Sequence, residues 1–282
     1  MLVDEIAVQD VLRVLEPIWQ TKTETAKRVR GRIEAVLSWS TVAGHRTGDN
    51  PARWAGNLKE LLPAADKVAK KENHPAVQIG DASRWFAAIR KREGMGARAL
   101  EFACLTAARS QEVRGATWDE IDLDGAMWTI PAARMKMERE HRVPLSKEAV
   151  TILDSLPRFE DNKLVFPAPR GGKMSDMTLS AAMKRLHAAD IAAGGHGYLD
   201  RVSKRPAVLH GLRSTFRDWV AERTHFPGDM AEIALAHKVG KAVEAAYRRG
   251  DMVEKRRAMM AAWADYLLGQ VHENIIPLSR EA

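Results

Sequence analysis

The stretch HGLRSTF, residues 210–216, begins a predicted helix that runs from 211 to 224. His210 and Arg213 are three residues apart, so they share one face of that helix. An imidazole that can donate a proton thus stands beside a guanidinium that can clamp a phosphate through two hydrogen bonds. Such pairs are common by chance, so this one indicates a phosphate-binding site only together with other residues of the chain.

A second arginine lies upstream in TAARSQEVRG, residues 106–115. Arg109 follows a predicted helix, 97–108, that is apolar nearly all round, so its guanidinium starts from a buried position. A buried guanidinium needs an anionic partner. Glu112 is one candidate for that partner, and a phosphate is the other.

Two candidate positions follow HGLRSTF. His237 ends the apolar run EIALAH, where a histidine is more often a core or capping group than a ligand. Tyr247, in EAAYRRGD, is followed directly by Arg248, and neighbouring arginines would lower the pKa of its phenol near a phosphate. The other two tyrosines differ, because Tyr198 lies in a glycine-rich loop and Tyr266 is predicted to pack in the core.

The chain from Asp81 onward is predicted to be mainly α with a small antiparallel β-sheet. Residues 127–132 and 141–146 have β character, and ARMKMERE between them, which contains Lys136, suits a hairpin tip. Helical periodicity marks the other segments. These predicted helices are 81–92, 97–108, 147–156, 178–190, 211–224, 229–237, 240–249 and 252–268.

Residues 1–63 are predicted to form a small helical domain, with helices at 4–16 and 23–42. Apolar residues of the second helix form a stripe, made of Val29, Ile33, Val36 and Leu37. Its basic residues lie on other faces, and they are Lys27, Arg28, Arg30 and Arg32. Such a helix suits the backbone or the major groove of DNA. Polar, aperiodic residues 64–80 predict a linker.

The composition narrows the class of protein. Lys and Arg total 44 against 37 for Asp and Glu, giving a charge of +7 and an isoelectric point near 9.6, which favours a polyanionic partner. The sequence has no run of 18 apolar residues, so no membrane-spanning helix is predicted. Its first residues include acids and no basic n-region, so no signal peptide is predicted. The single cysteine, Cys104, excludes an intramolecular disulfide and a cysteine-built zinc site, as expected in a reducing cytosol.

The order of these residues, R…H-x-x-R…H…Y, resembles the tyrosine recombinase family, the phage-type integrases, over residues 80–270. On that resemblance the catalytic set is Arg109, Lys136, His210, Arg213, His237 and Tyr247. Residues 1–63 look like the rear part of the family's core-binding domain. The family often has an arm-binding domain and a longer core-binding domain, and the chain begins too late for either to be complete.

The resemblance implies roles for the six residues. Tyr247 attacks the phosphorus and forms a 3′-phosphotyrosyl bond, and Arg109 and Arg213 clamp the non-bridging oxygens. Lys136 protonates the leaving 5′-oxygen. His210 helps manage the tyrosine proton, and His237 hydrogen-bonds the phosphate. No metal or other cofactor is expected, since the histidines lie among arginines that repel cations.

The expected function is therefore site-specific recombination for integration or excision of a mobile element. The expected partner is double-stranded DNA, bound also by Lys27, Arg28, Arg30, Arg32 and Arg248, with a homotetramer on DNA and a monomer free in solution. We expect a bacterial cytoplasmic, nucleoid-associated protein. Two alternatives stay open, a type IB topoisomerase and a non-catalytic DNA-binding relic. The expected domains are 1–63, a linker at 64–80, a catalytic domain at 81–270, and a tail at 271–282 that docks on a neighbouring subunit or packs locally.

Overall fold

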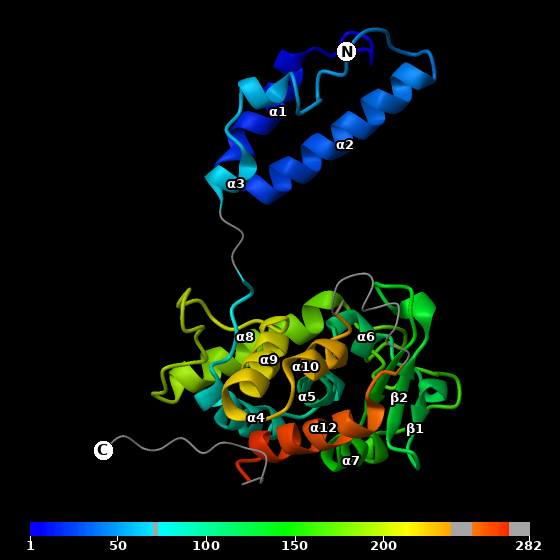
Figure 1. Cartoon of the computed structure of the whole chain (residues 1–282), viewed down its shortest axis with the longest axis vertical. Coiled ribbons are helices and arrows are strands. Elements are labelled where there is room, and N and C mark those ends of the chain that lie inside the picture. The colour runs from blue at the N-terminus through cyan, green and yellow to red at the C-terminus, as the bar shows by residue number, and fades with distance from the viewer. Residues whose placement is uncertain (70–72, 238–249, 271–282) are drawn as a thin grey trace. The chain divides into compact units, whose positions relative to one another are not determined.

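The computed structural model describes residues 1–69, 73–237 and 250–270 (Figure 1). The chain divides into two compact units, the N-terminal unit Met1–Asn73 and the C-terminal unit His74–Ala282. Each unit has its own hydrophobic core. The predicted fold class is confirmed, since the described residues are mostly helical with one small antiparallel sheet. The predicted helix 240–249, with Tyr247 and Arg248, and the predicted tail 271–282 lie outside the described residues.

Two helices, α1 (Val8–Trp19) and α2 (Thr23–Val42), pack together in the N-terminal unit, with the short α3 (Ala65–Val68) against α2. Trp19 anchors this core, because its ring stacks on Trp54 with centroids 5.6 Å apart. Its indole N–H donates to the Pro63 carbonyl at 2.8 Å. Helix α1 therefore continues past Pro17, beyond the predicted end at residue 16, so that Trp19 can reach the core.

Helix α2 has its predicted bounds, but its buried face differs from the predicted stripe. Leu37 and Ala26 are buried, whereas Val36 is 59% exposed. Helices α1 and α3 pack against α2, but they leave Val36 of the predicted stripe exposed to solvent.

The segment predicted as a linker, residues 64–80, is mostly part of the two units. Val68 packs against the N-terminal core, while Val77 is only 2% exposed in the core of the C-terminal unit. The Pro75 carbonyl accepts the Val208 N–H at 3.0 Å, and the Val77 carbonyl accepts the Thr215 hydroxyl at 2.7 Å. The linker prediction was too long because composition does not reveal such backbone hydrogen bonds.

Helix α5 (Met95–Thr106) lies at the centre of the C-terminal unit and is buried nearly all round. The helices that contact it include α4 (Ala82–Arg90), α7 (Lys147–Ser155), α8 (Asp176–Ala192) and α12 (Val253–Leu267). The helix ends two residues before its predicted end, where Ala107 turns left-handed at φ 49°. This turn leaves the Ala107 carbonyl available to a side-chain donor from another element.

The sheet has three antiparallel strands in the order β1 (Ile121–Asp122), β2 (Met127–Ile130) and β3 (His141–Pro144). The predicted hairpin is β2 and β3, whose register pairs Ile130 with His141. Strand β1 was not predicted from the sequence, because a strand of two residues has no periodicity to detect.

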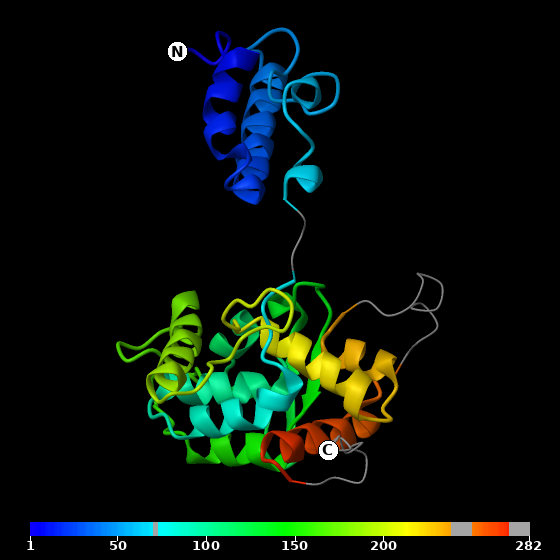
Figure 2. The same cartoon turned by 90° about the vertical axis from the view of Figure 1, so that its left-hand side faces the viewer.

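Three further helices complete the described part of the C-terminal unit (Figure 2). They are α6 (Ser110–Arg114), α9 (Gly211–Arg223) and α10 (Gly228–Ala234). Helix α9 packs on α10, and its Phe216 and Trp219 meet Trp263 and Tyr266 of α12 in one aromatic cluster. Tyr266 thus packs in the core as predicted, and its hydroxyl donates to the Ile79 carbonyl at 3.0 Å.

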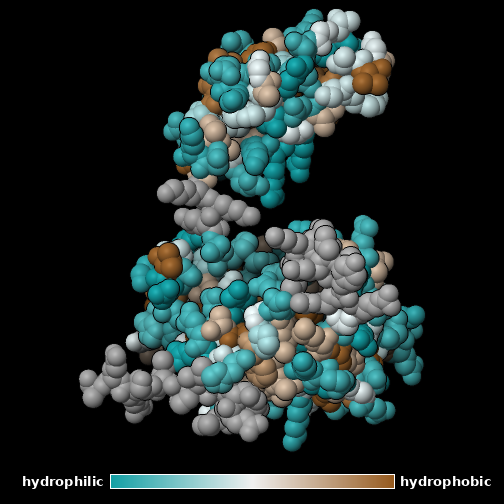
Figure 3. Space-filling model, in the orientation of Figure 1, coloured by the Kyte–Doolittle hydropathy of each residue, from teal (hydrophilic) through white to brown (hydrophobic). Residues whose placement is uncertain are grey.

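Hydrophilic side chains cover much of the visible surface of the C-terminal unit (Figure 3). In the described ranges, every helix is too short or too polar to cross a bilayer.

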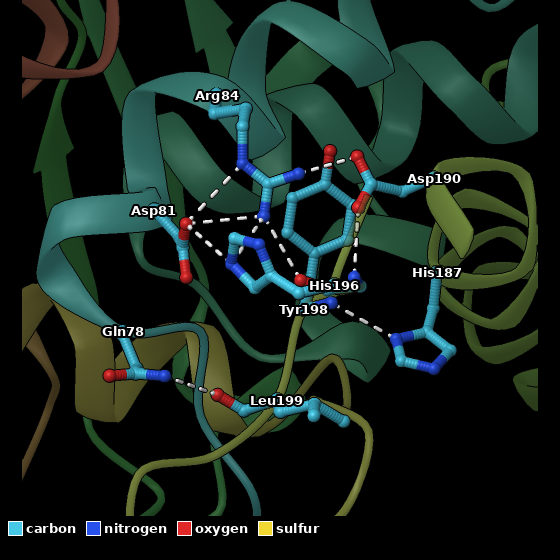
Figure 4. A network of polar contacts seen from close by, with 9 residues as sticks. Gln78, Asp81, Arg84, His187, Asp190, His196, Tyr198 and Leu199 are labelled. Carbon is cyan, nitrogen blue, oxygen red and sulfur yellow. Dashed lines mark hydrogen bonds and ion pairs between the residues drawn. The ribbon is translucent and has the colours of Figure 1, made fainter. Parts of the chain in front are cut away.

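A polar network fixes the loop that leads toward His210 (Figure 4). Arg84 of α4 pairs with Asp81 and Asp190, donates to the Gly197 carbonyl at 3.0 Å, and lies 4.4 Å above the Tyr198 ring. This loop is therefore tied to α4 and α8.

Candidate active site

Arg213 points from α9 into the centre of the candidate site. It is 6% exposed, and its guanidinium donates to the carbonyls of Ala107 and Leu235, the latter at 2.5 Å. Burial and the neighbouring Arg109 lower the pKa of Arg213 to about 10. The guanidinium therefore stays protonated at neutral pH and provides a buried positive charge.

Arg109 precedes α6 and lies beside Arg213. Its guanidinium donates to Glu112 at 2.8 Å, and its backbone N–H donates to the same carboxylate at 2.7 Å. The other guanidinium nitrogen lies 3.3 Å from the Leu235 carbonyl, which also accepts from Arg213. Glu112 is thus an acidic partner of Arg109, while the Arg109 side chain stays 21% exposed and open to a second anion.

His237 follows α10 and lies at the edge of this pair. Its Nε2 is 3.4 Å from an Arg213 nitrogen, and its Nδ1 is 2.7 Å from Glu232. Glu232 also accepts from Arg217 at 3.0 Å. Although partial burial raises the pKa of Glu232, the hydrogen bonds from His237 and Arg217 hold it below its usual value. Glu232, which orients His237, was not among the residues predicted from the sequence; its spacing of five residues from His237 was the available signal.

His210 caps the start of α9 and belongs to the same neighbourhood. Its ring lies edge-on to His74, with centroids 4.5 Å apart. Partial burial, His74 and the guanidiniums of Arg213 and Arg109 lower the pKa of His210 to about 4. The ring is therefore neutral at pH 7. His74 was missed because it falls in the segment predicted as a linker.

Lys136 lies on the exposed turn between β2 and β3. The turn is anchored by buried Met135 and by Arg134, which bonds Glu120 and the Glu112 carbonyl. Within the described ranges, no contact joins the Lys136 side chain to Arg109 or Arg213. The structure thus gathers Arg109, His210, Arg213 and His237 but does not bring Lys136 to them.

The predicted nucleophile Tyr247 lies outside the described residues, but the chain on its C-terminal side is held. Asp251 accepts two hydrogen bonds from Arg142 of β3, at 2.9 and 2.8 Å. Arg256, buried on α12, donates to the backbone carbonyls of Asp251 and Arg142 at 2.8 and 2.7 Å. Four residues after Tyr247, the chain is therefore fixed to the strand that returns from the Lys136 turn.

A fourth histidine, His141 of β3, is held beside the site. Its Nε2 lies 3.1 Å from the Ala234 carbonyl, and burial and Arg256 lower its pKa to about 4. The unfolded histidine titrates near 6.5, so between pH 6.5 and 4 the unfolded chain binds more protons. This group therefore makes stability fall as the pH falls through that window.

We expect His141→Asn to weaken this pH dependence. The free energy of unfolding, measured by urea titration at pH 7 and pH 5, should fall less in the variant than in the wild type. The exposed His225 has no such burial, so His225→Asn should keep the wild-type difference. An equal fall in His141→Asn and wild type would contradict this assignment.

The basic residues predicted on α2 divide into two groups. Lys27, Arg28 and Arg32 are exposed. Arg30, in contrast, is 16% exposed and donates to Glu34 at 2.7 Å and to the Ala52 carbonyl at 2.9 Å. Arg30 therefore has a role in the folding of its own unit, which the residue type alone did not reveal.

Across the described residues, no three His, Cys, Asp or Glu side chains are arranged to hold a metal ion. The absence of a metal from the reaction remains a prediction.

Each unit matches a model of a phage integrase domain. Residues 81–253 match the phage integrase family, and residues 1–57 match the phage integrase central domain. The chain belongs to the phage integrase family. Prophage integrase IntA of Escherichia coli strain K12 is 34% identical over 269 residues. That alignment covers 93% of this integrase-family chain and 59% of the relative, so the chain spans about three fifths of the relative's length.

Solved structures of lambda integrase share the fold of this phage integrase family member. A lambda integrase dimer bound to a COC′ core site has a TM-score of 0.59 at 18% identity, covering 84% of this chain and 80% of that one. A lambda integrase tetramer bound to a Holliday junction has a TM-score of 0.60 at 17% identity, covering 85% and 66%.

Proposed function

We propose that this chain is a site-specific tyrosine recombinase that cleaves and rejoins DNA through a 3′-phosphotyrosyl intermediate. The observation that carries the proposal is the meeting of Arg109 and Arg213 at the Leu235 carbonyl, with His237 beside them. Two guanidiniums need two anionic charges nearby, and Glu112 supplies one. A DNA phosphate supplies the other and accepts the hydrogen bonds that they can still donate.

The reaction needs charge neutralisation on the non-bridging oxygens, an in-line nucleophile and a proton for the leaving group. Arg109 and Arg213 supply the first, because both stay positively charged in a partly desolvated site. Tyr247 attacks the phosphorus and releases the 5′-oxygen, which Lys136 protonates. The phosphotyrosyl bond keeps the energy of the cleaved ester, so a 5′-hydroxyl of another strand can displace Tyr247 without ATP.

The two histidines have different parts in this proposal. His210 is neutral at pH 7, so it can accept the proton of the Tyr247 hydroxyl. His237 is oriented by Glu232 at Nδ1, so that its Nε2 faces Arg213 and the phosphate it binds. The similarity of this chain to a prophage integrase supports strand exchange as its reaction, rather than the nicking and closing of DNA by a type IB topoisomerase.

DNA binding and assembly on DNA belong to the same proposal. The lambda integrase neighbours are a dimer on a core site and a tetramer on a Holliday junction, which supports a tetramer on double-stranded DNA for this chain. A monomer in the absence of DNA and a location at the bacterial nucleoid are further parts of the proposal.

Covalent trapping tests the function. The chain is incubated with nicked suicide duplexes that carry candidate core sites, and an adduct that resists SDS is expected. Tyr247→Phe should form none, since phenylalanine has no hydroxyl to attack the phosphorus. An adduct of equal yield with Tyr247→Phe would overturn the nucleophile, and the absence of any adduct with the wild type would overturn the function.

On α2, we expect Arg32→Gln to change DNA affinity and Arg30→Gln to change stability. Arg32→Gln should weaken duplex binding and lower the slope of log affinity against log salt by about 1, with unchanged stability. Arg30→Gln should lower the free energy of unfolding by about 1–2 kcal/mol, because the Ala52 carbonyl and Glu34 lose their donor. Urea titrations and salt-dependent anisotropy measure the two effects. A stability loss confined to Arg32→Gln would contradict the assignment.

A further inference from the structure

A group of cations at the end of α6 opposite to Arg109 is not used by the proposed reaction. Gly115 follows α6, and a Cβ placed on it would lie 3.0 Å from an Arg134 guanidinium nitrogen and 3.2 Å from the Lys173 ammonium. The Arg134 guanidinium and the Lys173 ammonium therefore both lie close to Gly115, where the absence of a side chain leaves room for them. Burial, Arg114 and Arg134 lower the pKa of Lys173.

The two arginines of this group are held by partners of their own. Arg114 donates to the Met174 carbonyl at 2.7 Å and to Asp176 at 3.0 Å. Arg134 bonds Glu120 and the Glu112 carbonyl. Asp176 and Glu120 are thus already engaged by arginines, and Glu112 pairs with Arg109. Of the described side chains, none is an ion-pair partner for Lys173, which leaves its positive charge in excess.

The backbone holds Lys173 in this place. The turn 168–172 is closed by two hydrogen bonds, Ala168 N–H to the Gly172 carbonyl at 2.9 Å and Gly171 N–H to the Ala168 carbonyl at 2.8 Å. Gly171 and Gly172 both adopt positive φ, at 78° and 70°, which glycine allows without steric cost. A β-bridge then pairs Lys173 with Pro167. These bonds fix the backbone of Lys173, and its exposed side chain places the ammonium near Arg114 and Arg134.

An ammonium held among guanidiniums without an acid is stabilised by an anion with several acceptor oxygens. We propose that Lys173 binds a backbone phosphate of the DNA strand near the one held by Arg109 and Arg213. The inference rests on the proposed function. Helix α6 has five residues, a rise of about 7.5 Å, and phosphates of one strand succeed each other every 3.4 Å or so along the axis. A strand held at Arg109 can thus reach Lys173 within a few nucleotides.

The test compares Lys173→Gln with the wild type and with Lys147→Gln. Lys147 is an exposed lysine at the start of α7, and Figure 1 shows α7 on the opposite side of the unit from α6. Affinity of the full chain for a fluorescent duplex is measured by anisotropy between about 50 and 200 mM salt. Lys173→Gln should bind about 3- to 10-fold more weakly and lower the salt slope by about 1, with unchanged thermal unfolding.

Lys147→Gln should keep the wild-type affinity and slope, and Lys173→Arg should retain most of both. Wild-type binding with equal slopes for Lys173→Gln and Lys147→Gln would overturn the Lys173 site and leave the proposed function standing. The absence of salt-dependent duplex binding by the wild type would instead overturn both.

Discussion

Replacing Arg213 by lysine should slow the formation of the covalent DNA adduct by about 100-fold or more. The guanidinium of Arg213 donates to the Ala107 and Leu235 carbonyls, which hold one of its nitrogens 3.4 Å from His237 Nε2. A lysine ammonium is a point charge with three donors and no planar fork, so it cannot hold both carbonyls and a phosphate in this geometry. Single-turnover trapping on a suicide duplex measures the rate.

Arg223→Lys is the matched control, because Arg223 lies at the other end of the same helix, away from the site. It should retain the wild-type rate. Duplex affinity of Arg213→Lys should change by a much smaller factor than the rate, since one of many phosphate contacts is altered. A rate within a few-fold of wild type, with unchanged unfolding, would show that Arg213 is not part of the clamp.

The second large effect is expected at Gly211, the residue between His210 and Leu212. A Cβ at this position would lie 1.9 Å from the Pro75 carbonyl oxygen and 2.6 Å from its carbon. These are backbone atoms held by the Val208 N–H and, two residues on, by the Thr215 hydroxyl on Val77. The clash cannot be relieved by a side-chain rotation, so the segment that carries His74 must move.

We therefore expect Gly211→Ala to lower the free energy of unfolding by about 2–4 kcal/mol. It should also displace His74 from His210, and trapping should fall even where the chain is folded. Urea titration and the trapping assay measure both effects. Gly228 starts α10 with open space around its Cβ position, so Gly228→Ala serves as the control. Equal stability of the Gly211→Ala and Gly228→Ala variants would contradict this account.

Local patterns predicted the elements well where the pattern is long. The periodicity of 23–42 predicted both ends of α2, and the β character of 127–132 and 141–146 predicted the β2–β3 hairpin around Lys136. The prediction failed at the linker, because residues 74–77 bind to the start of α9 through backbone groups. Peptide carbonyls are the same in every residue, so their partners are not encoded in side-chain type.

The candidate site divides in the same way. By itself the sequence determined which residue types could bind and cleave a phosphodiester, and their order from Arg109 to Tyr247, because charge and nucleophilicity belong to single side chains. Only the tertiary structure decided that Arg109 and Arg213 share the Leu235 carbonyl, that Glu232 orients His237, and that Arg30 is engaged within its own unit. Those facts depend on contacts between residues distant in the chain, which burial and hydrogen bonding select only once the core has formed.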